Sequence, residues 1–195
     1  MEMITKKYIK KAVLFVLAAC VSAGITAGAS AQAAKAASTA EKLNTKVTKI
    51  VDKNVKAEDS AKKKLKKLFS YVEKKYDYSR KIGFEPYSGW EKDYALEMLE
   101  DGKGSCYHYA AAYAFLAKKA TGVSVRIGTG QTNGFSGSLQ KHAWTEVKLN
   151  GKWYVCDTNL DKYGADSSKK YFFKKRNSLK STYNQFKDAK YYDAV

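Results

Sequence analysis

The chain has 195 residues, of which 45% are hydrophobic, so it is long enough to bury a core and too apolar to be disordered throughout. Its 36 lysine and arginine residues against 19 acidic residues give a formal net charge of +17. This excess indicates an anionic partner, either nucleic acid or a surface such as a cell envelope.

Residues 1–31 are typical of a secretory signal peptide. A lysine-rich segment, residues 6–11, precedes an apolar run from Ala12 to Ala19, and small residues around Ala31 offer cleavage sites. The run is too short and too rich in small residues to span a membrane. Alternatively, residues 17–20 form a lipobox in which Cys20 is lipidated. Both interpretations predict export, to the extracellular space or the cell envelope, and export makes a nucleic-acid partner unlikely.

Residues 32–56 are rich in alanine and lysine and predict a linker or a loosely held helix ahead of one domain, residues 57–195. A helix is expected over residues 57–75, with Asp59 or Ser60 as its cap. Its apolar residues recur at steps of three and four, while its lysines lie mostly on the opposite, solvated face. The apolar set is Leu65, Leu68, Phe69 and Val72.

A loop is predicted over residues 76–90, which contain two glycines and the single proline, and a short helix over residues 91–99. Glycines then precede Cys106, and an alanine-rich helix follows it and ends at Gly122. Cys106 therefore lies at a helix N-terminus, where free N–H groups and the helix dipole favour a thiolate. The structural alternative is that Cys106 is a small buried hydrophobic residue.

A strand is predicted over residues 123–127 and a flexible connection over residues 128–140. The clearest local signal follows, because Asn150-Gly151 between two alternating runs predicts a hairpin of residues 143–149 and 152–156. A two-residue turn sets the register of that hairpin. The expected opposed pairs are Leu149 with Lys152, Val147 with Tyr154, Thr145 with Cys156, Trp144 with Asp157, and His142 with Asn159.

This register makes His142 and Asp157 diagonal neighbours on one face, close enough for a hydrogen bond. A carboxylate can orient an imidazole, and the imidazole can take the proton of a nearby thiol, here that of Cys106. The structural alternative is that Asp157 merely ends a strand and His142 is a surface histidine. His108 follows Cys106 by two positions on the same helix and points elsewhere, so it is expected to be a packing or surface residue.

Two cysteines remain after export, and a pair in an oxidising compartment can form a disulfide. Cys156, however, projects to the face opposite His142 and Asp157. A thiol of Cys106 that meets His142 cannot easily meet Cys156 as well. We therefore expect Cys156 to be a buried free thiol.

Three blocks together resemble the transglutaminase-like superfamily: Gly104-Ser105-Cys106 with its helix, residues 142–147, and residues 151–158. The resemblance implies an α+β, papain-like fold in which the nucleophile helix packs on an antiparallel sheet. It also implies that Cys106 is the nucleophile, His142 the base and Asp157 the orienting residue. Trp90, or Tyr87 near it, matches the upstream aromatic residue that assists the oxyanion in some members. Thr158 stands where the family often has proline.

The superfamily contains transglutaminases, proteases and deglycosylating amidases. The resemblance therefore implies a secreted enzyme that forms an acyl-enzyme on an amide of a protein or peptide, followed by hydrolysis or by transfer to an amine. It implies no cofactor and no metal, because no acidic cluster for calcium is evident. The net charge adds an anionic envelope component as a partner. The alternative is a non-catalytic envelope- or protein-binding module on the same fold.

Overall fold

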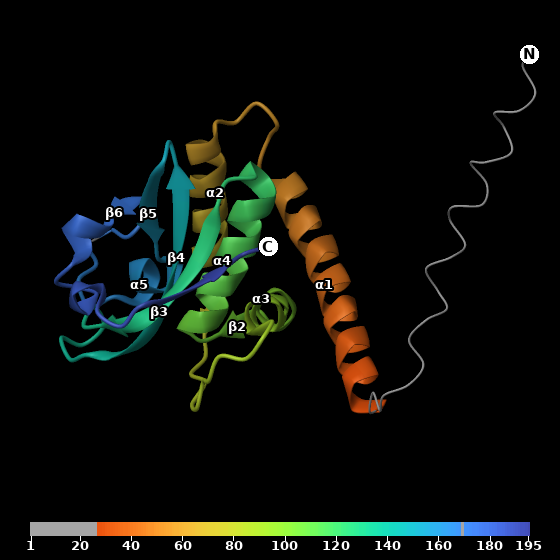
Figure 1. Cartoon of the computed structure of the whole chain (residues 1–195). Helices are drawn as coiled ribbons and strands as arrows, with labels where there is room; N and C mark the ends of the chain where they lie inside the picture. Colours follow the sequence, from red (N-terminus) through yellow and green to blue (C-terminus); the bar gives the residue numbers. More distant parts are fainter. Residues whose placement is uncertain (1–26, 169) are drawn as a thin grey trace, which may run out of the picture. The chain divides into compact units, whose positions relative to one another are not determined.

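The structure is a computed structural model that describes residues 27–168 and 170–195 (Figure 1). Most of the expected signal peptide, including Cys20, lies outside the described residues, so cleavage and lipidation stay predictions. The fold is carried by a compact unit of residues 35–195. In the described part of the chain, no helix has both the length and the apolarity needed to cross a membrane.

The predicted α+β fold is confirmed, with helices packed on an antiparallel five-stranded sheet of order β6-β5-β4-β3-β7. The helices are α1 (Ala27–Asn54), α2 (Ala61–Lys75), α3 (Trp90–Asp101), α4 (Cys106–Thr121) and α5 (Thr158–Tyr163). The sheet strands are β3 (Val125–Thr132), β4 (Gln140–Leu149), β5 (Lys152–Cys156), β6 (Lys174–Lys175) and β7 (Lys190–Asp193). Two short parallel strands, β1 (Asp77–Tyr78) and β2 (Lys103–Gly104), form a second sheet.

The segment expected to be a linker or a loose helix is helical, as α1. Leu43, Val47 and Val51 recur at four-residue steps and are buried in the main core. Lys46 also forms an ion pair with Glu100 of α3. Helix α1 therefore packs on the main core through these residues.

Helix α2 begins at residue 61 because Ser60 caps it, and the hydroxyl of Ser60 accepts a hydrogen bond from the Lys63 N–H. The other expected cap, Asp59, has a different role. Its buried carboxylate accepts the Lys56 N–H and pairs with the ammonium groups of Lys63 and Lys67. These contacts hold the pKa of Asp59 well below its usual range.

Helix α4 is the centre of the main core, and every residue from Cys106 to Ala117 is buried. It contacts α2 and α3 on its flanks and β3 and β4 of the sheet (Figure 1). Its alanines allow this close approach, since a small side chain lets neighbouring backbones come near. The Thr145 hydroxyl of β4 donates to the Ala110 carbonyl at 2.8 Å and so ties the first turns of α4 to the sheet.

The hairpin is formed as predicted. Leu149 pairs with Lys152, Val147 with Tyr154 and Thr145 with Cys156, and the turn residues Asn150 and Gly151 both have positive φ. The expected register fails beyond Cys156, because β5 ends there and Asp157 becomes the N-cap of α5. Asn159 is therefore a buried helical residue and not the strand partner of His142.

Strand β3 is longer than predicted and includes residues 128–132, which were expected to be flexible. The glycines there are needed for packing. A Cβ on Gly128 would lie 2.4 Å from Trp144 Cε2, so the indole packs directly on the β3 backbone. Only residues 133–139 connect β3 to β4 as a loop.

The C-terminal segment, for which the sequence predicts no role, completes the sheet (Figure 1, blue). Strand β6 pairs with β5 and β7 pairs with β3, so this segment supplies both edges. Between them, two 3-10 turns, Arg176–Leu179 and Asn184–Phe186, cover a second core. That core consists of Trp144, Val155, Leu160, Tyr171, Leu179 and Tyr183.

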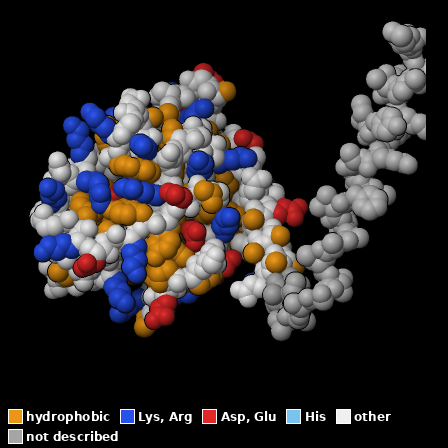
Figure 2. Space-filling model, in the orientation of Figure 1, with side chains coloured by type: hydrophobic (Ala, Val, Ile, Leu, Met, Phe, Trp, Pro, Cys, Tyr) orange, Lys and Arg blue, Asp and Glu red, His pale blue; other side chains and the backbone are white. Residues whose placement is uncertain are grey.

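On the face shown in Figure 2, lysine and arginine side chains are scattered among apolar and acidic ones and do not gather into one patch. The large positive charge is therefore spread over this face. Any local concentration of positive charge therefore lies at a particular pocket and not across this whole face.

Candidate active site

Cys106 is the first residue of α4, and its side chain is nearly buried, with 8% of the residue exposed. The turn before it is held by the pairing of β1 with β2, in which Tyr78 stands opposite Gly104. Gly104 is required there, because a Cβ at that position would lie 2.5 Å from the His108 Cβ. The chain before the thiol is therefore fixed by backbone pairing and by close packing.

His108 is buried, stacks on Tyr94 and also caps α4. Its Nδ1 accepts a hydrogen bond from the Ser105 N–H at 3.2 Å and lies 2.9 Å from the Ser105 hydroxyl. Its Nε2 lies 3.0 Å from a Glu97 carboxylate oxygen. The predicted packing role of His108 is confirmed. Its capping role was not predicted: His108 occupies the position that glutamate usually holds in a capping box.

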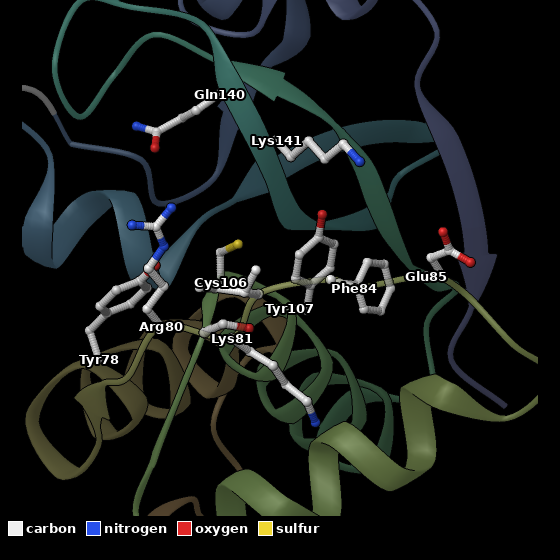
Figure 3. A pocket seen from close by; sticks show the side chains of 12 residues that line it. Tyr78, Arg80, Lys81, Phe84, Glu85, Cys106, Tyr107, Gln140 and Lys141 are labelled. Carbon is white, nitrogen blue, oxygen red and sulfur yellow. The ribbon is translucent and has the colours of Figure 1, made fainter.

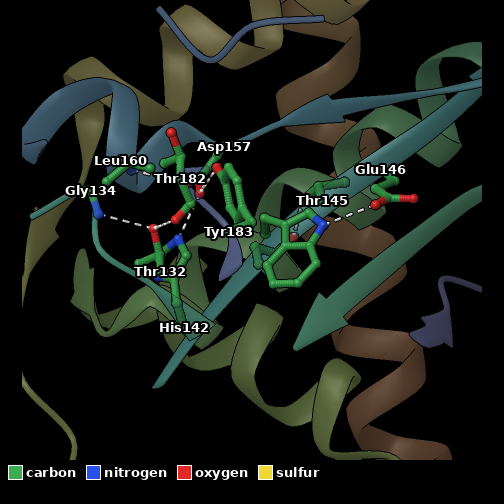
Figure 4. Close-up of polar contacts among 11 residues, drawn as sticks. Thr132, Gly134, His142, Thr145, Glu146, Asp157, Leu160, Thr182 and Tyr183 are labelled. Atoms are coloured by element: carbon green, nitrogen blue, oxygen red, sulfur yellow. Dashed lines mark hydrogen bonds and ion pairs between the residues drawn. The ribbon is translucent and has the colours of Figure 1, made fainter. Parts of the chain in front are cut away.

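His142 and Asp157 form a buried pair, with Nε2 of His142 2.6 Å from Oδ2 of Asp157 (Figure 4). Asp157 is further fixed by the Leu160 N–H, which donates to Oδ1 at 2.8 Å, and by the Tyr183 hydroxyl, which donates to Oδ2 at 2.7 Å. The carboxylate therefore orients His142 while it also caps α5. The predicted contact between His142 and Asp157 is present, although Asp157 makes it as the N-cap of α5 and not as a residue of strand β5.

The other ring nitrogen of His142, Nδ1, is buried and has no hydrogen-bond partner among the described residues. Burial lowers the pKa of His142, but the charge and hydrogen bond of Asp157, with a smaller contribution from Cys106, raise it to about 10. The thiol is therefore a neighbour of the imidazole, and Nδ1 is the nitrogen left to receive its proton. A contact of this kind tightens when a substrate binds.

Cys156 is a fully buried free thiol, as predicted, and no disulfide joins it to Cys106. It faces α4, where its surroundings include Tyr113. Burial raises its pKa to about 12. At neutral pH this thiol is therefore protonated, and its burial shields it from reagents in solution.

A pocket of about 550 Å³ opens beside Cys106 (Figure 3). One wall is the segment from Tyr78 to Glu85, and the other includes Gln140 and Lys141 at the start of β4. Ser105, Cys106 and Tyr107 form its base. The sulfur of Cys106 therefore faces a space that is large enough for part of a peptide.

The model of the transglutaminase-like superfamily matches residues 48–158, which include Cys106, His142 and Asp157. The chain belongs to this superfamily. Cysteine-dependent enzymes are general in the superfamily, so membership supports a thiol-enzyme family without naming the reaction of this chain. A comparison with curated proteins gives no match.

Two solved structures resemble this superfamily member in fold. A "putative cysteine protease" from Cytophaga hutchinsonii is 16% identical, with a TM-score of 0.48 over 77% of this chain and 47% of its own chain. A structure named as a TGase is 17% identical, with a TM-score of 0.40 over 63% of this chain and 31% of its own. This chain thus spans less than half the length of either.

The two aromatic residues suggested by the superfamily resemblance do not line the pocket. Trp90 is fully buried and packs edge-on against Tyr94, and the Tyr87 hydroxyl donates to Asp93 at 2.9 Å. The pocket instead has Tyr78, whose pKa is raised by burial and by the neighbouring Cys106. No local pattern marks Tyr78 in the sequence, because strand β1 is only two residues long.

Tyr183 is a second residue that the sequence analysis missed. Its position is fixed by its neighbour Thr182, whose carbonyl accepts hydrogen bonds from the Thr132 hydroxyl at 2.8 Å and the Asn133 N–H at 3.1 Å (Figure 4). Burial, followed by the charge of Asp157, raises the pKa of Tyr183. The phenol therefore stays protonated and remains a hydrogen-bond donor to Asp157.

Within residues 27–168 and 170–195, no group of three or more histidine, cysteine and acidic side chains is arranged to hold a metal ion. The polar groups around Cys106 are instead suited to moving one proton between a thiol and an imidazole. They comprise one buried imidazole–carboxylate pair, one thiol and the N–H groups at a helix start.

Proposed function

We propose that this chain is an exported thiol enzyme that forms an acyl-enzyme at Cys106 on an amide of a peptide or protein. The proposal rests on one observation: Cys106 neighbours a histidine whose Nε2 is bound to Asp157 and whose Nδ1 has no other partner. That arrangement supplies a nucleophile, a base and an orienting carboxylate.

The reactive form is the ion pair in which the Cys106 proton resides on Nδ1 of His142, and the raised pKa of His142 favours this pair before substrate binds. The thiolate of that pair attacks the amide carbonyl carbon. The imidazolium is stabilised by Asp157, as the raised pKa of His142 indicates. The developing oxyanion lies near the free N–H groups at the start of α4, and the protonated Tyr78 hydroxyl is the candidate for a second donor. His142 then protonates the leaving amine, and a thioester remains.

The thioester can react with water, which gives an acid, or with a primary amine, which gives a new amide. We propose that hydrolysis dominates, because the pocket walls are exposed and leave water free to enter. The exposed wall residues include Tyr78, Arg80, Ile82, Gln140 and Lys141. Incubation of a glutamine peptide with a labelled primary amine separates the two outcomes, since only transfer attaches the label.

The test of the mechanism is alkylation of the full chain by iodoacetamide at pH 6–7, with peptide mapping of the labelled cysteine. We expect fast labelling at Cys106, about tenfold to a hundredfold slower in His142→Ala, because an ordinary thiol is almost wholly protonated at this pH. Cys156→Ala is the matched control and should label as the wild type does. Equal, slow labelling of all three proteins would favour a non-catalytic binding module.

Export is part of the proposal and is supported by the signal-like residues 1–31. Mass spectrometry of the protein released by a producing cell would locate its first residue. A start near residue 32 supports cleavage and release, whereas a lipid-modified Cys20 that disappears in Cys20→Ala supports a membrane-anchored lipoprotein.

A further inference from the structure

The pocket beside Cys106 is lined by three cationic side chains, Arg80, Lys81 and Lys141, and one anionic side chain, Glu85. Lys81 is already neutralised, since its ammonium group lies 3.2 Å from a Glu97 carboxylate oxygen and over the Tyr94 ring. Arg80 and Lys141 form no side-chain hydrogen bond or ion pair within the described part of the chain. Two unpaired positive charges therefore face the space next to the nucleophile.

Arg80 and Cys106 line the same pocket, and both are neighbours of Tyr78. The pKa of Tyr78 is raised by burial and by Cys106 and is lowered by Arg80, so the phenol neighbours both groups. In Figure 3 the guanidinium lies beside the Tyr78 ring on one side of Cys106, while Glu85 lies beyond Phe84 on the other side. The anionic residue is thus at the far end of the pocket from Arg80.

Lys141 reaches the pocket from the opposite wall, one residue before His142 on β4 (Figure 3). The α4 N-terminus between the two walls adds the positive end of a helix dipole. The three contributions come from three separate elements that line one pocket. A neutral or cationic substrate would leave these charges without partners when it displaces water from the pocket.

We propose that this pocket selects acyl donors that carry a carboxylate next to the reacting amide, with Arg80 and Lys141 binding that carboxylate. The inference rests on the proposed function and narrows its substrate to acidic peptides. Arginine is suited to this task, because its planar fork can bind both carboxylate oxygens, and Lys141 adds a point charge. The carboxylate can be an acidic side chain within a protein or the free terminal carboxyl of a short peptide.

The first experiment compares two alkylating agents that differ in charge. Iodoacetate and iodoacetamide react alike, since the thiolate displaces iodide and a thioether forms, but only iodoacetate carries a carboxylate next to the reacting carbon. For each reagent, the rate constant for alkylation of Cys106 is divided by that reagent's rate constant with glutathione, which corrects for intrinsic reactivity. The ratio compared is the corrected iodoacetate rate divided by the corrected iodoacetamide rate. We expect this ratio to exceed one and to fall at high salt.

Arg80→Gln and Lys141→Gln each remove one of the proposed charges, and each should lower the ratio about twofold to fivefold, as expected for one partly exposed charge. Lys49→Gln is the matched control, because it removes one exposed charge from α1 and Lys49 does not line this pocket. Its ratio should equal that of the wild type. A ratio that neither pocket variant lowers overturns the proposal.

The second experiment identifies the source of the carboxylate by protection of Cys106 against iodoacetamide. One peptide has blocked ends and an internal glutamate, the other has a free terminal carboxyl as its only anion, and each is compared with its amide counterpart. Protection by one acidic peptide that weakens in Arg80→Gln supports the proposal and names the source. Absence of protection by both peptides overturns the substrate class.

Failure of this inference is distinguishable from failure of the proposed function. If Cys106 labels slowly with iodoacetamide and His142→Ala does not change that rate, the proposed function is wrong. If labelling is fast and depends on His142, but the reagent ratio is the same in Arg80→Gln and Lys141→Gln as in the wild type, the proposed function stands. Only the proposed carboxylate site is then wrong.

Discussion

Tyr183 donates its hydroxyl proton to Oδ2 of Asp157 at 2.7 Å, and the same oxygen lies 2.6 Å from Nε2 of His142. One carboxylate oxygen is therefore shared between the proposed base and a phenol from the C-terminal segment. Edge-on contact of Tyr183 with Trp144, at a centroid distance of 5.1 Å, sets the direction of that phenol. The C-terminal segment is thus part of the site.

Tyr183→Phe should destabilise the protein by about 1–3 kcal/mol, because it removes a buried hydrogen bond to a charged group. It should also raise the pKa of His142 further, since Asp157 loses a donor that offsets its charge. The alkaline limb of the pH profile for Cys106 alkylation would then move to higher pH. Denaturant unfolding and the pH–rate profile measure the two effects, and the pH shift should vanish when Asp157→Asn is added.

Asp157→Asn and Asp157→Ala separate the two roles of this carboxylate. Asparagine is also a good N-cap, so Asp157→Asn keeps the bond to the Leu160 N–H but removes the charge beside His142. We expect labelling of Cys106 at pH 6.5 to slow about tenfold to a hundredfold in both variants. Asp157→Ala should lose about 1–2 kcal/mol more stability, because α5 also loses its cap.

The same pair has a pH dependence with a definite sign. The pKa of His142 is raised from 6.5 to about 10 in the folded protein, so its pairing with Asp157 stabilises the fold fully below pH 6.5. That stabilisation is lost as the pH rises through about 10. The difference in unfolding free energy between wild type and Asp157→Asn should therefore be largest at acidic pH, and a difference that grows above neutral pH would contradict the pairing.

Local signals predicted the hairpin, and with it the contact of His142 with Asp157. A two-residue Asn-Gly turn dictates which residues stand opposite each other, so the register as far as Cys156 followed from the turn alone. The turn does not determine the position of the next residue, Asp157. Asp157 leaves the ladder to cap α5, and such a switch depends on the packing of Leu160 against the second core.

Tyr183 and Tyr78 lay beyond sequence reasoning for a different reason. Tyr183 meets Asp157 across 26 positions. The elements between them, α5, β6 and a 3-10 turn, are too short for a periodic pattern to place Tyr183 there. Tyr78 belongs to a two-residue strand whose partner, β2, is equally short. Both residues are positioned by long-range contacts, and periodicity reports only local structure.

Gly128 and Gly130 test the close packing of Trp144 on β3. An added Cβ would lie 2.4 Å from the indole at Gly128 but 3.1 Å from it at Gly130. Gly128→Ala should therefore cost about 1–3 kcal/mol through displacement of Trp144, and Gly130→Ala should cost less. Denaturant unfolding measures both values, and equal costs would show that the indole yields freely. Displacement of Trp144 should also slow labelling of Cys106, since Trp144 packs on Tyr183.

His108 makes the capped start of α4 dependent on pH. Burial lowers the pKa of His108, against the opposing effect of Glu97, and only the unprotonated Nδ1 can accept the Ser105 N–H. Lys81 also acts to lower this pKa, whereas Asp101 acts to raise it. The cap therefore stabilises the fold above the unfolded pKa of about 6.5, and this contribution is lost as the pH falls.

His108→Gln is the sharpest variant for this cap, because a glutamine oxygen can accept the Ser105 N–H and does not titrate. The unfolding free energy of the wild type should fall relative to His108→Gln between pH 7.5 and pH 5, whereas His108→Ala should be less stable at both values by about 1–2 kcal/mol. The contribution of His142 cancels in this comparison, since all three proteins retain it. Parallel curves for wild type and His108→Gln would mean that His108 packs against Tyr94 without controlling the position of Cys106.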